Sequence, residues 1–305
     1  MKRVIKICFA LFIATSLYAD NPEIILFSTK DLKSISTKVI EDIFAKSGYK
    51  IESNRDMNGP FKKQFNKTPF AIYNLMLVYD PKISQKLVSK YENSGIFTPF
   101  TILMYQKKGD DRFYIGCLSA KAMSRITGHN DPLFNELEKH TIETIKKAVP
   151  NATRVSLSYS PKSLKKKWLT KFEMEADPDE IEDVKDETEM VLEDGLKPIG
   201  FVMANFLDYN FFLKDAGDDT YLFYDDYSLC KLKVIYTVSQ VRPEAGVFAP
   251  CTLAVYYKKG SGKIKFVYPN VYNWMYTLAL EDRNSIKELE KAQKDMVALL
   301  KKVIE

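Results

Sequence analysis

The side chain with the clearest chemical potential is Cys251, which directly follows Pro250 at the head of an apolar segment. A thiol at the start of a strand can face a cleft and serve as a metal ligand or a redox group. The sequence shows no basic partner that would lower its pKa, and burial as a small apolar side chain is the commoner role. A disulfide with Cys230 is a further alternative, if their strands are neighbours with Cα atoms less than about 7 Å apart.

Two carboxylate–amide pairs recur along the chain, Asp56 with Asn58 and Asp208 with Asn210. Each pair is expected at the end of a strand, where Asx side chains commonly bond their own backbone in turns. We favour this structural role, and a binding site made of a carboxylate and an amide is the functional alternative.

Motifs for metal, cofactor or nucleophilic chemistry are missing from the sequence. Neither His129 nor His140 stands at a metal-ligand spacing from a cysteine or a carboxylate. There is no C-x-x-C-H, G-x-S-x-G, H-E-x-x-H or phosphate-binding glycine loop. We therefore predict no metal and no cofactor, and we favour a protein without catalytic activity.

The elements that position these side chains are revealed by an internal duplication. Residues 95–109 (GIFTPFTILMYQKKG) and 246–260 (GVFAPCTLAVYYKKG) are identical at eight of fifteen positions without a gap. Chance gives about one match, so the chain contains two copies of one module about 151 residues apart. Tyr105 and Tyr256 occupy matching positions, where they either line a groove shared by the copies or pack across strands.

Each copy is predicted to contain the element order β-α-β(4)-α, an α+β module with helices over one face of an antiparallel sheet. In the first copy, residues 24–27 form an apolar strand, and Leu32, Ile35, Val39 and Ile43 recur at helical spacing before Gly48. Further strands are expected at 49–56, 70–78, 98–106 and 112–118, with counterparts at 201–209, 221–229, 249–257 and 263–268. Residues 153–159 alternate like a strand between the copies.

The first nineteen residues have the composition of a secretory signal peptide. A basic start is followed by an apolar stretch from Ile7 to Leu17 and a small residue, Ala19, before the expected cleavage site. Without it, 42 basic residues face 40 acidic ones, so the formal charge falls from +5 to +2 and nothing indicates nucleic-acid binding. We expect a periplasmic protein without a stable membrane anchor, in which 20–150 form the first domain, 151–167 a linker and 168–305 the second domain.

The segment from Gly246 to Tyr256, with Pro250-Cys251 leading an apolar strand, resembles the bacterial family called domain of unknown function 302. In the first copy, the segment Asp80-Pro81 to Leu87 looks like the short helix that members of this family carry. The resemblance implies a β-α-β(4)-α fold related to half of the TATA-binding-protein saddle, and it implies no settled activity. Copy one has Phe100 in the place of the family cysteine, and copy two lacks the Asp-Pro step.

These observations favour an exported protein whose two copies pack as an intramolecular pseudo-dimer. The expected function is non-catalytic binding of a small molecule or an envelope protein between the copies. The alternative is a thiol-dependent redox or metal-handling protein centred on Cys251. Candidate residues are Cys251, Pro250, Asp80, Pro81, Tyr105, Tyr256, Asp56 and Asp208.

Overall fold

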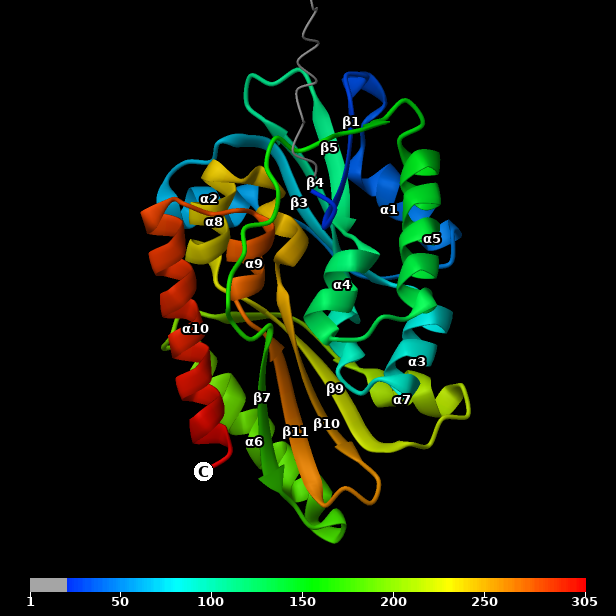
Figure 1. Ribbon diagram of the computed structural model, residues 1–305, viewed down its shortest axis with the longest axis vertical. Helices are drawn as coiled ribbons and strands as arrows, with labels where there is room; N and C mark the ends of the chain where they lie inside the picture. The colour runs from blue at the N-terminus through cyan, green and yellow to red at the C-terminus, as the bar shows by residue number, and fades with distance from the viewer. Residues whose placement is uncertain (1–20) are drawn as a thin grey trace, which may run out of the picture.

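The computed structural model describes residues 21–305, and within them the strands form two antiparallel sheets with helices packed on them. Figure 1 shows the sheet of the first half at the top of the molecule and that of the second half below it. The α+β prediction is therefore confirmed. The predicted signal peptide, residues 1–19, lies outside the described residues.

The first sheet has the strand order β2-β3-β4-β5-β1-β6. Its strands are β1 (Ile24–Thr29), β2 (Lys50–Asp56), β3 (Phe70–Tyr79), β4 (Phe100–Lys107), β5 (Phe113–Leu118) and β6 (Thr153–Arg154). The second sheet has the order β7-β11-β10-β9-β8. Its strands are β7 (Leu169–Glu175), β8 (Val202–Asp208), β9 (Tyr221–Cys230), β10 (Cys251–Lys258) and β11 (Lys263–Pro269).

The two sheets share one topology. With β6 set aside, the order 2-3-4-5-1 of the first sheet matches 8-9-10-11-7 of the second strand for strand. Both β3 and β9 run for ten residues and start 151 residues apart, at Phe70 and Tyr221. The repeat read from the sequence thus corresponds to two halves with the same strand order.

Helices are also matched between the halves. Those of the first half are α1 (Thr37–Lys46), α2 (Asn58–Phe65), α3 (Pro81–Lys90), α4 (Ala120–Thr127) and α5 (Pro132–Ala148). Those of the second half are α6 (Ile181–Leu196), α7 (Tyr209–Asp215), α8 (Leu232–Val241), α9 (Tyr272–Thr277) and α10 (Arg283–Val303). Among these helices of residues 21–305, none combines the length and apolar character needed to cross a membrane.

Two predicted elements are wrong in extent. Helix α1 begins at Thr37 rather than near Leu32, because the Ser36 hydroxyl accepts a hydrogen bond from the Val39 amide and caps the helix there. Of the strand expected at 153–159, only Thr153–Arg154 pairs, with β1. The chain then crosses to the other half, where the Lys162 amide donates to the Tyr276 carbonyl.

No position was predicted for the first strand of the second copy, although the predicted element order requires one. Strand β7 takes this place, where a basic segment (162–171) is followed by an acidic one (173–189). Its burial alternates, and Phe172 and Met174 pack on the core while Glu173 and Glu175 point outward. Both carboxylates lie within 3.3 Å of the Lys263 ammonium on the neighbouring strand. An amphipathic strand therefore lies at the boundary between the basic and the acidic segment.

The duplicated segments dock each half onto the sheet of the other. Gly95 lies against Tyr224 on β9, and its counterpart Gly246 lies against Leu75, Leu103 and Tyr73. A Cβ at either glycine would come within 3.0 Å of these side chains. Close approach between the halves therefore favours glycine at both places, which explains why both segments begin with this residue.

Candidate functional site

A cavity of about 250 Å³ lies between the two halves, and we call it the apolar seam. The first half contributes Ser53, Arg55, Met57, Pro60, Gln64, Leu75 and Leu77, and the second half contributes Gly200, Val202, Ala204, Cys230, Leu232 and Pro250. Most of these side chains are aliphatic or otherwise apolar, as is usual for the walls of small-molecule sites. An apolar cavity of about 150 Å³ is large enough to hold benzene, so this one has room for a somewhat larger guest.

The apolar seam is framed by the edge strands of the two sheets. Arg55 on β2 donates a hydrogen bond to the Ala204 carbonyl on β8 at 3.4 Å. Asn205 on β8 donates in the other direction to a Glu52 carboxylate oxygen at 3.3 Å. These two contacts hold the rim of the cavity together through side chains rather than through a strand ladder.

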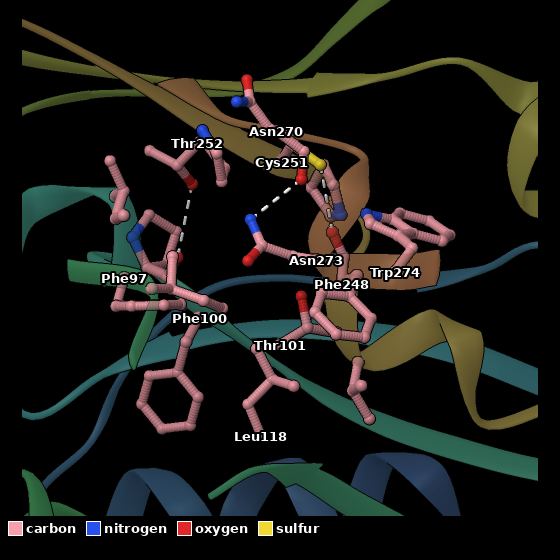
Figure 2. A pocket seen from close by; sticks show the side chains of 16 residues that line it. Phe97, Phe100, Thr101, Leu118, Phe248, Cys251, Thr252, Asn270, Asn273 and Trp274 are labelled. Carbon is pink, nitrogen blue, oxygen red and sulfur yellow. Dashed lines mark hydrogen bonds between the residues drawn. The ribbon is translucent and has the colours of Figure 1, made fainter. Parts of the chain in front are cut away.

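A smaller cavity of about 30 Å³ lies where the duplicated segments meet, and Figure 2 shows the side chains around it. Phe97, Phe100 and Leu118 come from the first half, and Cys251 and Trp274 come from the second. The Thr252 hydroxyl donates to the Pro99 carbonyl at 3.4 Å across the boundary between the halves. This space is close to that of a single water molecule, so it suits packing rather than ligand binding.

Cys230 and Cys251 lie close together, but they are free thiols and form no disulfide. Cys251 lies opposite Leu229 on the neighbouring strand, beside Cys230, and both cysteines are free. Burial raises the pKa of Cys251 to about 11 and that of Cys230 to about 12, so both are protonated at neutral pH. The Cys251 thiol lies 3.3 Å from the Phe248 carbonyl oxygen and donates to it. The geometry therefore gives no activated thiolate, which a redox role needs.

Asp80 and Pro81 begin α3, as the sequence indicates. One Asp80 carboxylate oxygen accepts hydrogen bonds from the amides of Lys82 and Ile83, each at 3.0 Å, and Pro81 takes the first helical position. The other oxygen lies 2.8 Å from Nδ1 of His140, a contact that the sequence did not suggest. Helix α8 forms at the matching place in the second half without a side-chain cap.

Asp56 and Asp208 act as turn and cap residues in the structure. The Asp56 carboxylate accepts from the Asn58 amide at 2.9 Å, and that of Asp208 accepts from the Phe211 amide at 3.2 Å. The amide side chain of Asn210 donates to the Leu222 carbonyl at 2.7 Å. These bonds match the structural role favoured from sequence.

Tyr105 and Tyr256 pack across strands. Tyr256 stacks on Tyr224 of β9 with ring centroids 4.9 Å apart, and Tyr105 stacks on Tyr114 of β5 at 4.7 Å. Both rings are buried and line neither cavity. Of the candidate site residues, only Pro250 lines the apolar seam, where it joins Cys230, which the sequence indicated only as a disulfide alternative. Pro250 and Cys251 both line the smaller cavity.

A metal site is not apparent in the described part of the chain. Within residues 21–305, no group of three or more His, Cys, Asp or Glu side chains is arranged to hold a metal ion.

The residues that match the walls of the apolar seam in the other copy also meet between the halves, and we call this cluster the polar seam. It contains Tyr79, Tyr209, Asp226 and Ser228, where the apolar seam has Cys230, Met57, Leu75 and Leu77. The rings of Tyr79 and Tyr209 lie 6.0 Å apart, edge to face. The polar seam therefore holds two bulky tyrosines at the positions where the apolar seam has a cysteine and a methionine.

The polar seam carries buried oxygens without partners. Within residues 21–305, the side-chain oxygens of its four members are enclosed and make no hydrogen bond. Burial, with a smaller contribution from Asp225, raises the pKa of Asp226 well above its usual range. Unsatisfied buried groups of this kind cost roughly 1–3 kcal/mol each.

The residues that sequence reasoning missed are the walls of the apolar seam, above all Arg55, Leu75 and Leu77. Because these residues belong to β2 and β3, their sequence pattern indicates only a strand and gives no sign of a site. The signal that could have found them is the comparison of the two copies, because Leu75 and Leu77 align with Asp226 and Ser228. Apolar residues in one copy and polar residues at the matched positions of the other indicate that the two positions have different surroundings in the folded protein.

The second half of the chain matches a known family. The model described as "Domain of unknown function DUF302" matches residues 181–304. A solved structure, the uncharacterized conserved protein DUF302 from Bacillus stearothermophilus, aligns with 45% of this chain and 98% of its own length, at 20% identity and a TM-score of 0.38. No curated protein matches the chain.

Proposed function

We propose that this chain, whose residues 181–304 form a DUF302 domain, binds a small apolar molecule in the apolar seam without transforming it. The two halves then act as an intramolecular pseudo-dimer, with the first half a diverged copy of the same family and the whole protein exported to the periplasm. The observation that carries the proposal is the cavity of about 250 Å³ whose walls come from both halves.

The size and lining of the cavity set the scale of binding. At about 24 cal/mol per Å³ of apolar cavity, an occupant recovers at most about 6 kcal/mol. This corresponds to a dissociation constant of about 40 μM or weaker. The value is an upper limit on the apolar contribution, because the cavity reaches the surface beside the exposed Arg55.

The two seams together supply a test by substitution. The variant Met57→Phe with Cys230→Phe introduces rings where the polar seam has Tyr209 and Tyr79, so the fold tolerates rings at the matched positions. Calorimetric titration with 2-phenylethanol should show binding to the wild-type protein, with a negative heat-capacity change, and no binding to the filled variant. Met190→Phe, on an exposed part of α6, is the matched control and should bind like the wild type.

Two results would contradict the proposal. One is the absence of binding of 2-phenylethanol and similar apolar probes to the wild-type protein. The other is unchanged binding in the filled variant, which would place the probe elsewhere. The Cys251→Ser variant should bind like the wild type, since Cys251 does not line the apolar seam.

A further inference from the structure

Arg55 stands at the rim of the apolar seam with its positive charge unmatched. Its guanidinium donates one long hydrogen bond, at 3.4 Å, to the Ala204 carbonyl, and within residues 21–305 it has no carboxylate partner. By contrast, Arg125 forms an ion pair with Glu23 at 2.7 Å in the same molecule. A planar guanidinium with free donors suits a carboxylate, which it can bind with two parallel hydrogen bonds.

The residues that line the cavity together with Arg55 favour an anion over a cation. Ser53 and Gln64 line the same cavity and bring further hydrogen-bond donors, and no aspartate or glutamate is among the described residues that line it. Much of the remaining lining is aliphatic: Leu75 and Leu77 lie beside Arg55 and Ser53 on the neighbouring strand, and Val202 comes from the other half. The cavity therefore has an apolar body and one cationic, donor-rich end.

The fold does not require an arginine at this place. The matching residue of the second half is Leu207, which lies beside Asp226 as Arg55 lies beside Leu75. The arginine therefore occurs in the copy that lines the cavity, and the leucine occurs beside the polar seam. This association links Arg55 to the occupant of the cavity rather than to the strand.

We infer that the apolar seam takes a small apolar carboxylic acid in its ionised form. The carboxylate binds Arg55 at the rim, and the hydrocarbon part contacts Leu75, Leu77 and Val202. This inference rests on the proposed function and adds the chemical class of the ligand. A carboxylate is the best match because a single guanidinium fork offers two donors and one positive charge.

Three probes with one phenyl group and different ends provide the test: phenylacetate, 2-phenylethanol and 2-phenylethylamine. Calorimetric titration at pH 7 and low salt should show that phenylacetate binds the wild-type protein about tenfold more tightly than the alcohol, and that the amine binds most weakly. In Arg55→Met, the affinity for phenylacetate should fall to that for the alcohol, while the affinity for the alcohol stays the same. Lys50→Met, an exposed cation on the same strand that does not line the cavity, should keep the wild-type order.

The possible failures are distinguishable. If the alcohol binds the wild-type protein as tightly as phenylacetate does, or if Arg55→Met keeps the preference for phenylacetate, the inference is overturned while the proposed function stands. If none of the three probes binds the wild-type protein, both are overturned. If phenylacetate binds equally well to the variant with Met57→Phe and Cys230→Phe, Arg55 attracts the anion without the cavity, and the inference is overturned.

Discussion

Substituting alanine for the two docking glycines should destabilise the whole protein, because each glycine lies against the sheet of the other half. In Gly95→Ala the new Cβ would lie 2.3 Å from the Tyr224 hydroxyl oxygen and 2.6 Å from its Cε1. Tyr224 is fully buried, stacks on Tyr256, and donates to the Glu92 carbonyl at 2.5 Å, so it has no room to withdraw.

The magnitude follows from these contacts. Overpacking of a filled interior costs about 1–3 kcal/mol, and loss of the Tyr224 hydrogen bond adds about 1 kcal/mol. We expect Gly95→Ala to lower the free energy of unfolding by about 2–4 kcal/mol. Gly246→Ala should cost about 1–3 kcal/mol, because its new Cβ would meet the flexible ends of Leu103 and Leu75 at 2.6 and 2.9 Å.

Urea unfolding followed by tryptophan fluorescence measures the effect, since Trp168 and Trp274 both lie in the second half. Gly59→Ala is the control, because nothing lies within 4 Å of its Cβ and it sits in helix α2. The control should be neutral or stabilising by up to about 1 kcal/mol. A midpoint for Gly95→Ala equal to that of Gly59→Ala would refute the docking argument.

Three further predictions concern buried groups. Asp226→Asn should remove a pH dependence of the free energy of unfolding. Because the folded-state pKa of Asp226 is raised, the wild-type protein should lose stability relative to the variant as the pH rises above 4, by up to about 1.4 kcal/mol per pH unit. Plots of the free energy of unfolding against pH that run parallel for the two proteins would contradict this. Arg125→Met should cost about 3–5 kcal/mol in chemical denaturation, because it leaves the carboxylate of Glu23 buried and unpaired; a loss under 1 kcal/mol would contradict this. Cys251 and Cys230 should react with a thiol reagent at pH 7.5 only after unfolding, since burial raises their pKa values to about 11 and 12; rapid labelling of the folded protein would count against this.

The order of the strands along the chain could be predicted from the sequence because the repeat supplies two copies of most elements, whereas their order within each sheet was not predicted. Strand β3 and its counterpart β9 are both ten residues long and rich in aromatic and aliphatic residues, although β9 also contains Asp225 and Asp226. The glycine-containing turns after β4 and β10 define the hairpins. The position of strand β7 was not predicted, because its alternating apolar and charged residues lie where a basic segment is followed by an acidic one. The local sequence pattern predicts an element well where both copies of the repeat share that pattern.

The candidate site could not be predicted in the same way, because it depends on contacts between segments far apart in the chain. Arg55 and Ala204 are 149 residues apart, and Asp80 and His140 are 60 apart. Pro250 was singled out as a neighbour of Cys251, and the structure places it in both cavities. The cysteine that drew attention packs instead against the core, where burial keeps it protonated.

The most direct test of the account is a nuclear Overhauser measurement between the ring protons of bound 2-phenylethanol and labelled methyl groups of the protein. We predict contacts from one bound ring to Leu75 and Leu77 of the first half and, at the same time, to Val202 and Leu232 of the second half. Contacts confined to one half, or to methyl groups outside the apolar seam, would contradict the claim that the two halves form a binding cavity between them.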